Sequence, residues 1–335
     1  MQRLCFFILA IFVSLPIAGA DEVPIDEWDV PYDQSRPRDP FALANGDVWF
    51  VGQRAGYLAR LDSESGTFEK IALKDGSGPH NLIVARNGDV WFAGNRTALI
   101  GRYDPSNGDI EEVMMPDPAA RDPHTLVFDA DQSHIWFTVQ GGNRIGRLTL
   151  ATRAVKLLTP SVDRARPYGI KMAPDGSVWV ALFGTNKLAH IDADTLTVTE
   201  VDLPSAEARP RRLEVLADGS VWYVDYAQGK LGRYLPETDA FTEWQMPQGE
   251  GARPYGMAAD NSGRLWMVST GVQPNVFVGF DPVSETFFSQ TPVASGGGTI
   301  RHMHYHEPTG SIWFGTDANT VGRAIVEPDA SRLAQ

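Results

Sequence analysis

The segment Asn87-Gly88-Asp89-Val90-Trp91 joins a glycine turn to the start of an apolar strand. Two later segments repeat it closely, Asp175-Gly176-Ser177-Val178-Trp179 and Asp218-Gly219-Ser220-Val221-Trp222. The same tryptophan position recurs every 42 to 47 residues along the chain, at Trp49, Trp91, Trp136, Trp179, Trp222, Trp266 and Trp313. A repeat of this length is typical of a propeller blade, so seven tryptophans predict seven blades.

Further strand signals surround each tryptophan. A short polar loop leads to a segment such as Ile100-Gly101-Arg102-Tyr103, and then to an alternating stretch such as 241–247 that ends at a proline. No stretch shows a sustained apolar period of 3.6 residues, so helices should be nearly absent. The sequence therefore predicts an all-β, seven-bladed β-propeller of four-stranded blades. Residues that recur in most units, the tryptophans and Arg102, Arg147, Arg233 and Arg323, are interpreted as packing between blades.

The two ends of the chain predict how the ring closes. After Trp313 only residues 320–326 offer another strand, so the last blade lacks its outer strand. Residues 26–31 near the N-terminus resemble residues 242–247, which have the pattern of an outer strand. We expect the N-terminal strand to complete the last blade and remove the open edge. The propeller would then span 21–326 as one domain, followed by a polar tail at 327–335.

The first twenty residues have the composition of a secretory signal peptide. Arg3 is their only charge, an apolar run follows, and Ala18-Gly19-Ala20 offers a cleavage site after Ala20. No later segment is long and apolar enough to cross a membrane. Cleavage would remove Cys5, the only cysteine, and would leave a net charge of −14. So acidic a chain argues against sequence-independent nucleic-acid binding. We expect a periplasmic or secreted monomer whose partner is a small molecule at the funnel mouth.

One position in each repeat is a candidate for contact with that small molecule. The start of the first strand and the end of the second lie at the same mouth of a propeller. Eleven or twelve residues before each tryptophan the residue type varies among His, Tyr and Arg, whereas a structural position tends to keep one type. A ligand-facing ring is favoured, and rim side chains around a water-filled pore remain the alternative. The first six members are Arg38, His80, His124, Tyr168, Arg211 and Tyr255.

The seventh blade leaves two registers open. A strict count places His302 in the ring, as a catalytic base beside His124. A turn longer by one residue places Arg301 there instead and sets Met303 and Tyr305 in apolar positions. The apolar pattern favours Arg301. His302 alternates with two further histidines, an arrangement that can hold a metal through imidazole nitrogens.

A second position follows each tryptophan by three or four residues. Its only carboxylates are Asp225 and Asp317. Acid–base chemistry or the binding of a hard cation at this mouth would therefore fall to these two residues.

The segments Arg166-Pro167-Tyr168-Gly169-Ile170 and Asn143-Arg144-Ile145-Gly146-Arg147, with the Asp-Gly-x-Val-Trp turns, resemble the streptogramin lyase (virginiamycin B lyase-like) family. The resemblance implies a seven-bladed propeller and a C–O lyase that opens a cyclic depsipeptide at its ester by elimination, with Mg²⁺ as electrophile and a histidine as base. Under the strict count that histidine is His302. Asp317 matches a metal-binding glutamate, whereas Ile300 and Tyr255 stand where the family has a second metal-binding glutamate and a substrate-binding histidine.

Three functions therefore remain open from the sequence. The first is a metal-assisted lyase acting on an ester or lactone. The second is a non-catalytic binding propeller, whose arginines at one mouth suit a carboxylate or phosphate. The third, a calcium-dependent sugar-lactone hydrolase, requires several convergent carboxylates and a six-bladed ring.

Overall fold

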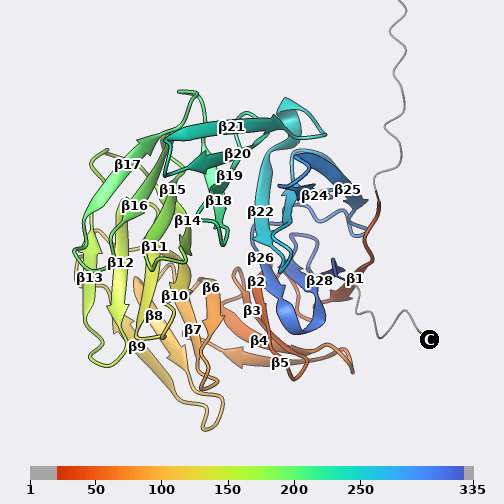
Figure 1. Cartoon of the computed structure of the whole chain (residues 1–335). Helices are drawn as coiled ribbons and strands as arrows, with labels where there is room; N and C mark the ends of the chain where they lie inside the picture. The colour runs from red at the N-terminus through yellow and green to blue at the C-terminus, as the bar shows by residue number, and fades with distance from the viewer. Residues whose placement is uncertain (1–20, 328–335) are drawn as a thin grey trace, which may run out of the picture.

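The computed structural model describes residues 21–327, and the predicted signal peptide lies outside them. Seven four-stranded antiparallel sheets are arranged around a central axis, here called the channel, with inner strands at the centre and outer strands at the periphery (Figure 1). The predicted seven-bladed propeller is confirmed. Blade 1 contains β2 (Pro37–Ala42), β3 (Asp47–Gly52), β4 (Tyr57–Asp62) and β5 (Thr67–Ala72). Blade 2 contains β6 (Pro79–Val84), β7 (Val90–Gly94), β8 (Leu99–Tyr103) and β9 (Ile110–Met114). Blade 3 contains β10 (Pro123–Phe128), β11 (His134–Val139), β12 (Arg144–Thr149) and β13 (Val155–Leu158).

The later blades repeat this order. Two three-residue 3-10 helices, Glu250–Ala252 and Glu307–Thr309, are the only helices of residues 21–327, and neither is long enough to span a membrane. Blades 4 to 7 contain β14 (Pro167–Met172), β15 (Val178–Leu182), β16 (Lys187–Ile191) and β17 (Val198–Asp202); β18 (Pro210–Val215), β19 (Val221–Asp225), β20 (Lys230–Leu235) and β21 (Ala240–Gln245); β22 (Pro254–Ala259), β23 (Leu265–Ser269), β24 (Val276–Asp281) and β25 (Thr286–Pro292); β26 (Met303–His306), β27 (Ser311–Gly315), β28 (Thr320–Ile325) and β1 (Ile25–Asp29).

Ring closure occurs as predicted, through the N-terminal strand. β1 pairs antiparallel with β28 in the register Ile25↔Ala324 to Asp29↔Thr320, and the two strands lie side by side in Figure 1. The Trp28 ring stacks on Trp313 with their centroids 5.3 Å apart. The last blade thus joins the two ends of the chain.

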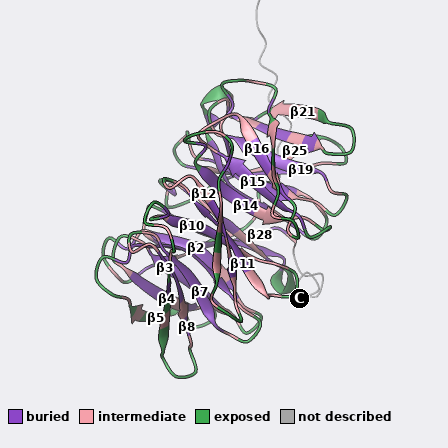
Figure 2. Cartoon of the chain, turned by 90° about the vertical axis from the view of Figure 1, so that its left-hand side faces the viewer, coloured by how far each residue is buried: buried purple, intermediate pink, exposed green. Residues whose placement is uncertain are grey.

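The repeated tryptophans are core residues, since each is at most 5% exposed. Trp91 packs with Phe137 of the next blade, and Trp136 packs with Val180 of the blade after that. The strand-three glycine accommodates the ring that follows the tryptophan, because a Cβ on Gly101 would lie 2.1 Å from Phe92. Figure 2 shows the resulting gradient, with buried inner strands and exposed turns.

Candidate functional site

An irregularity in the inner strands directs consecutive side chains toward the channel. In β18, the inner strand of blade 5, the pairing with β19 shifts register between Pro210 and Leu213. The inner strands of blades 1 to 4 and of blade 6 also carry a register shift near their start. A bulge re-aims side chains that a regular strand would send to opposite faces. Two successive residues of each blade, such as Arg211 and Arg212, can therefore approach the channel in two layers.

The first layer, here called the mouth ring, brings together the six predicted residues of blades 1 to 6. His80 and His124 lie with ring centroids 3.6 Å apart, and His124 lies 4.1 Å from Tyr168. The Tyr168 hydroxyl contacts that of Tyr255 across the channel. Arg38 Nη1 donates to His80 Nε2 at 2.6 Å. These five residues are at most 5% exposed, so they fill the channel rather than line an open pore.

Arg211 is the sixth member of the mouth ring and, unlike the other five, is half-buried. Its guanidinium carbon lies 3.6 Å from the centroid of the Tyr255 ring, 4.3 Å from that of Tyr226 and 4.5 Å from that of Phe183. Within residues 21–327, no carboxylate lies within 4 Å of this guanidinium, and its Nε has no hydrogen-bond partner. Arg211 is thus a cation held by aromatic faces, with donors left for another group.

The seventh blade adopts the longer-turn register. Met303 pairs with Phe314 and His304 with Trp313, as Leu213 pairs with Tyr223 and Glu214 with Trp222 in blade 5. Arg301 therefore occupies the mouth-ring position, and His302 lies one layer deeper. The extra length is taken up by the helix Glu307–Thr309 and by Gly310 in the left-handed conformation. The strict count, which set His302 in the ring, does not describe this blade.

The second layer was not anticipated from the sequence. Arg212 crosses the channel, where its Nη1 donates to Thr125 Oγ1 at 3.0 Å and its Nε donates to the Arg301 carbonyl at 3.1 Å. Asp39 lies 4.0 Å from Arg212 Nη2 and accepts from Asn81 Nδ2 at 2.9 Å. Arg212, Asp39, Asn81 and Thr125 are each at most 4% exposed. This Arg212 layer links blades 1, 2, 3, 5 and 7 beneath the mouth ring.

Gly169 provides the space that Arg212 requires. A Cβ at this position would lie 2.8 Å from the Arg211 carbonyl oxygen and 2.9 Å from the Arg212 Cα. Gly169 belongs to the same layer in blade 4, so its missing side chain lets the neighbouring strand approach. The sequence signal for this layer was the polar residue that directly follows most mouth-ring positions, such as Arg212 after Arg211. Strict alternation along a strand, however, places these residues on the face opposite the mouth ring.

The histidines of both layers are held neutral. Burial, followed by the field of Arg38, lowers the pKa of His80 well below its usual value. Burial and the positive charge of Arg212 likewise lower the pKa of His124. Burial also lowers the pKa of His302, although the Asp39 carboxylate acts to raise it. Because a guanidinium can only donate, His80 Nε2 accepts the bond from Arg38. His124 and His302 keep the neutral form that a base requires, but His124 is 2% exposed.

The hydroxyls of Tyr168 and Tyr255 have pKa values shifted in opposite directions. Burial opposes ionisation of Tyr168, but Arg211, Arg38 and Arg212 outweigh it and lower its pKa to about 8. Burial and the neighbouring Tyr168 raise the pKa of Tyr255. The pair therefore loses its first proton, that of Tyr168, at a lower pH than a free tyrosine does. Tyr255 keeps the second proton and donates it in a hydrogen bond to the Tyr168 phenolate.

We expect the tyrosinate absorbance of the folded protein to show one step near pH 8 that Tyr168→Phe abolishes. A pKa lowered below the unfolded value of about 10 adds stability at high pH, and this gain disappears as pH falls through about 8. Tyr103→Phe is the control, since burial raises the pKa of Tyr103. A step that survives Tyr168→Phe would contradict the assignment.

Asp317 is paired with arginines rather than placed to hold a cation. Its Oδ1 accepts from Arg301 Nη1 at 2.5 Å and from Arg36 Nε at 3.1 Å, and its Oδ2 accepts from Arg301 Nη2 at 2.6 Å. Burial opposes ionisation of Asp317, but the two guanidiniums lower its pKa. Both oxygens that a hard cation would need are therefore already bonded to positive groups.

Asp225 closes a turn instead of facing the channel. Its Oδ1 accepts from the backbone N–H groups of Arg209, Ala227 and Gln228 at 2.9 to 3.2 Å. Burial raises its pKa, and its side chain lies in blade 5 while Asp317 lies in blade 7. Within residues 21–327, no three His, Cys, Asp or Glu side chains form a group that could hold a metal. The residues present do not fit Mg²⁺.

The histidines near the seventh inner strand also do not converge on a metal. His304 stacks on Phe41 with ring centroids 4.1 Å apart, whereas His306 Nδ1 contacts Thr309 Oγ1 at 2.8 Å. His302 precedes β26, so the three residues do not alternate along one strand.

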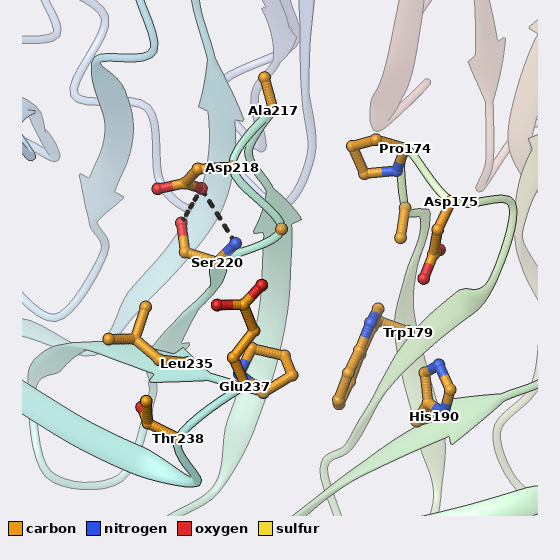
Figure 3. A pocket seen from close by; sticks show the side chains of 13 residues that line it. Pro174, Asp175, Trp179, His190, Ala217, Asp218, Ser220, Leu235, Glu237 and Thr238 are labelled. Carbon is orange, nitrogen blue, oxygen red and sulfur yellow. Dashed lines mark hydrogen bonds between the residues drawn. The ribbon is translucent and has the colours of Figure 1, made fainter.

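A groove of about 410 Å³ between blades 4 and 5 lies among the turns, away from the mouth ring. Figure 3 shows Trp179 and His190 on one wall, facing Glu237 and Ser220 on the other. His190 pairs with Trp179 where Arg102 pairs with Trp91 in blade 2, and its side chain is shorter than arginine. Grooves of about 460 and 490 Å³ also lie where Arg60 pairs with Trp49 and Arg102 with Trp91, so a groove at this place recurs with the repeat.

Comparison with known proteins agrees with the observed architecture. The virginiamycin B lyase family model matches residues 23–324. A selenomethionine-substituted virginiamycin B lyase from Staphylococcus aureus is 22% identical, with 90% of this chain and 99% of that chain covered and a TM-score of 0.81. A streptogramin B lyase is 24% identical, with 90% and 97% covered and a TM-score of 0.80. A catalytically inactive variant of the S. aureus enzyme, solved with quinupristin, is 22% identical, with 90% and 99% covered and a TM-score of 0.81. No curated protein matches the chain. Since the family match covers most of its length, the chain belongs to the virginiamycin B lyase family.

Proposed function

We propose that the protein binds a small anionic ligand, a carboxylate or a phosphate, at the channel mouth. The observation that carries this proposal is Arg211, a half-buried guanidinium with aromatic neighbours and no carboxylate partner. A ligand oxygen there would accept charge-assisted hydrogen bonds, which are roughly twice as strong as neutral ones. The tyrosines beneath Arg211 fix its position before the ligand arrives.

The charge around the mouth supports an anion over a cation. Five arginines (Arg36, Arg38, Arg211, Arg212 and Arg301) accompany two aspartates (Asp39 and Asp317) in the two layers. The chain as a whole has a formal net charge of −13, so this excess of positive charge is local. Such a patch draws anions toward one point of an otherwise acidic surface.

The accessible part of the site lies above the buried ring. Arg301 and Arg36 retain 13% and 34% of their side-chain exposure while they hold Asp317. Tyr226 and Phe183 are half-buried and flank Arg211. A ligand would therefore rest on Arg211 and these two rings, with its charge toward the arginines. A flat carboxylate such as benzoate matches this arrangement.

The test is thermal unfolding of the mature protein with phosphate, acetate and benzoate, and with benzamide as the uncharged counterpart of benzoate. A ligand bound only by the native state raises the unfolding midpoint. We expect at least one anion to raise it and benzamide to leave it unchanged. Arg211→Gln should weaken anion binding about tenfold, the loss of one charged hydrogen bond. Arg54→Gln, at an exposed arginine near the same mouth, is the matched control.

The metal-assisted lyase reaction is less well supported by the residues present. Asp317 is neutralised by two arginines, Ile300 is fully buried, and Tyr255 lies within the packed ring. We expect quinupristin to stay intact with Mg²⁺ and Mg²⁺ not to shift the unfolding midpoint. Chromatography of the antibiotic after incubation measures the first, with an active streptogramin lyase as positive control. Mg²⁺-dependent opening, lost in Asp317→Ala, would overturn this account of the mouth.

A further inference from the structure

The channel contains a second chamber on the far side of the Arg212 layer. It encloses about 400 Å³, and every blade contributes to its wall. The apolar part of the wall includes Phe41, Leu82, Leu126, Ile170, Ala258 and Met303. We call this space the lower chamber. Its volume falls within the range of small-molecule pockets.

The Arg212 layer separates the lower chamber from the mouth. Arg212 and Thr125 are 4% and 2% exposed and bonded to each other across the channel, so a ligand cannot pass between them without breaking this contact. The opposite end of the chamber reaches solvent, because Lys171 keeps 35% of its side-chain exposure and Tyr305 is half-buried. Access is therefore from the face opposite the mouth ring.

Polar groups in the wall have unused hydrogen-bonding capacity. Glu214 is 6% exposed, and its Oε1 forms an ion pair with Lys171 Nζ at 2.7 Å, so a second lone pair of this oxygen can still accept a hydrogen bond. His302 also lines the chamber, and its Nδ1 has no partner. Buried polar atoms usually have a hydrogen-bond partner, so the unpaired His302 Nδ1 beside a cavity indicates a missing partner.

The charges around the chamber cancel. Lys171 pairs with Glu214 in the wall, and Arg212 faces Asp39 in the layer above. Burial keeps the remaining titratable groups of the wall, His302 and His304, neutral by lowering their pKa values. An ionic ligand would lose its hydration without gaining an opposite charge. The chamber therefore suits an uncharged molecule.

We propose that the lower chamber is a second binding site, separate from the mouth, for an uncharged and largely apolar molecule with one hydrogen-bond donor. The apolar body packs against the six wall residues named above. Its donor bonds to Glu214 Oε1, and His302 Nδ1 lies on the same wall for a second polar contact. This site is independent of the anion site, since neither Arg211 nor Arg301 lines it.

N-phenyl-1-naphthylamine is a suitable probe, because it is neutral, aromatic and has one N–H donor. We expect its fluorescence to rise saturably on titration with the mature protein. Val127→Phe and Ala258→Phe should each weaken this binding about tenfold or more by filling the chamber. Both positions pair with the blade tryptophan, as Phe41 does in blade 1, so the propeller already accepts phenylalanine at this register.

Two controls make the result decisive. Val283→Phe adds the same ring at a residue that is 92% exposed, and it should bind the probe as the native protein does. The N-methyl analogue of the probe, which lacks the donor, should bind at least about threefold more weakly to the native protein, and Glu214→Leu should remove this difference. The proposal is overturned if the native protein shows no saturable binding, if both filled variants bind normally, or if the two probes bind equally.

Discussion

Replacing Arg212 with methionine is expected to lower the free energy of unfolding by about 3 kcal/mol. Methionine keeps most of the length but removes the guanidinium that faces Asp39 and donates to Thr125. Asp39 is 1% exposed and would keep only Arg38 and Asn81 as partners. Breaking a buried charge pair on one side costs more than the pair contributes, because the remaining charge stays buried. Urea-induced unfolding followed by tryptophan fluorescence measures the effect.

The matched control for this experiment is Arg54→Met, at an exposed residue of the same mouth. It should change the free energy of unfolding by less than about 0.5 kcal/mol. An Arg212→Met protein that unfolds within about 0.5 kcal/mol of the native one would show that the Arg212 layer does not hold the blades together.

Replacing Trp28 with alanine is expected to cost about 3 kcal/mol, the usual loss for a packed tryptophan. Trp28 joins the last blade from the N-terminal end of the chain and stacks on Trp313 with the Arg323 guanidinium carbon 5.3 Å from its centroid. Its loss would loosen β1 and expose the edge of β28. Thermal unfolding with light scattering would record both the lower midpoint and any aggregation at that edge.

Blade 5 provides an internal standard for the Trp28 experiment. Trp244 stacks on Trp222 with centroids also 5.3 Å apart, but both residues belong to one continuous stretch of chain. If β1 is a full outer strand, Trp28→Ala and Trp244→Ala should destabilise the protein equally, within about 1 kcal/mol. A Trp244→Ala protein that is destabilised beside an unaffected Trp28→Ala would contradict closure by the N-terminal strand.

The fold was predictable because its signal is repeated. Trp136 and its six equivalents mark the blades, and the likeness of residues 26–31 to an outer strand predicts the closure. The mouth ring was also accessible from the sequence, since a proline before His124 or Tyr168 marks the start of each inner strand. In the seventh blade the apolar pattern of Met303 favoured the register that the structure has.

The Arg212 layer and the pairing of Asp317 were not predictable in the same way. A regular strand would direct Arg211 and Arg212 to opposite faces, and only the bulge brings both to the channel. Asp317 meets Arg36 across the junction of the first and last blades, a contact between residues far apart in the chain. Sequence spacing identified the carboxylate as a candidate metal ligand, but it gave no information about the cations around it.

The most direct test of the anion site is isothermal titration of the protein without residues 1–20 with benzoate and benzamide, at low and at physiological ionic strength. Our account predicts saturable benzoate binding that weakens with added salt and with Arg211→Gln, and no binding of benzamide. Equal binding of the two compounds, or benzoate binding unchanged in Arg211→Gln, would contradict the assignment of Arg211 as the anion-binding residue.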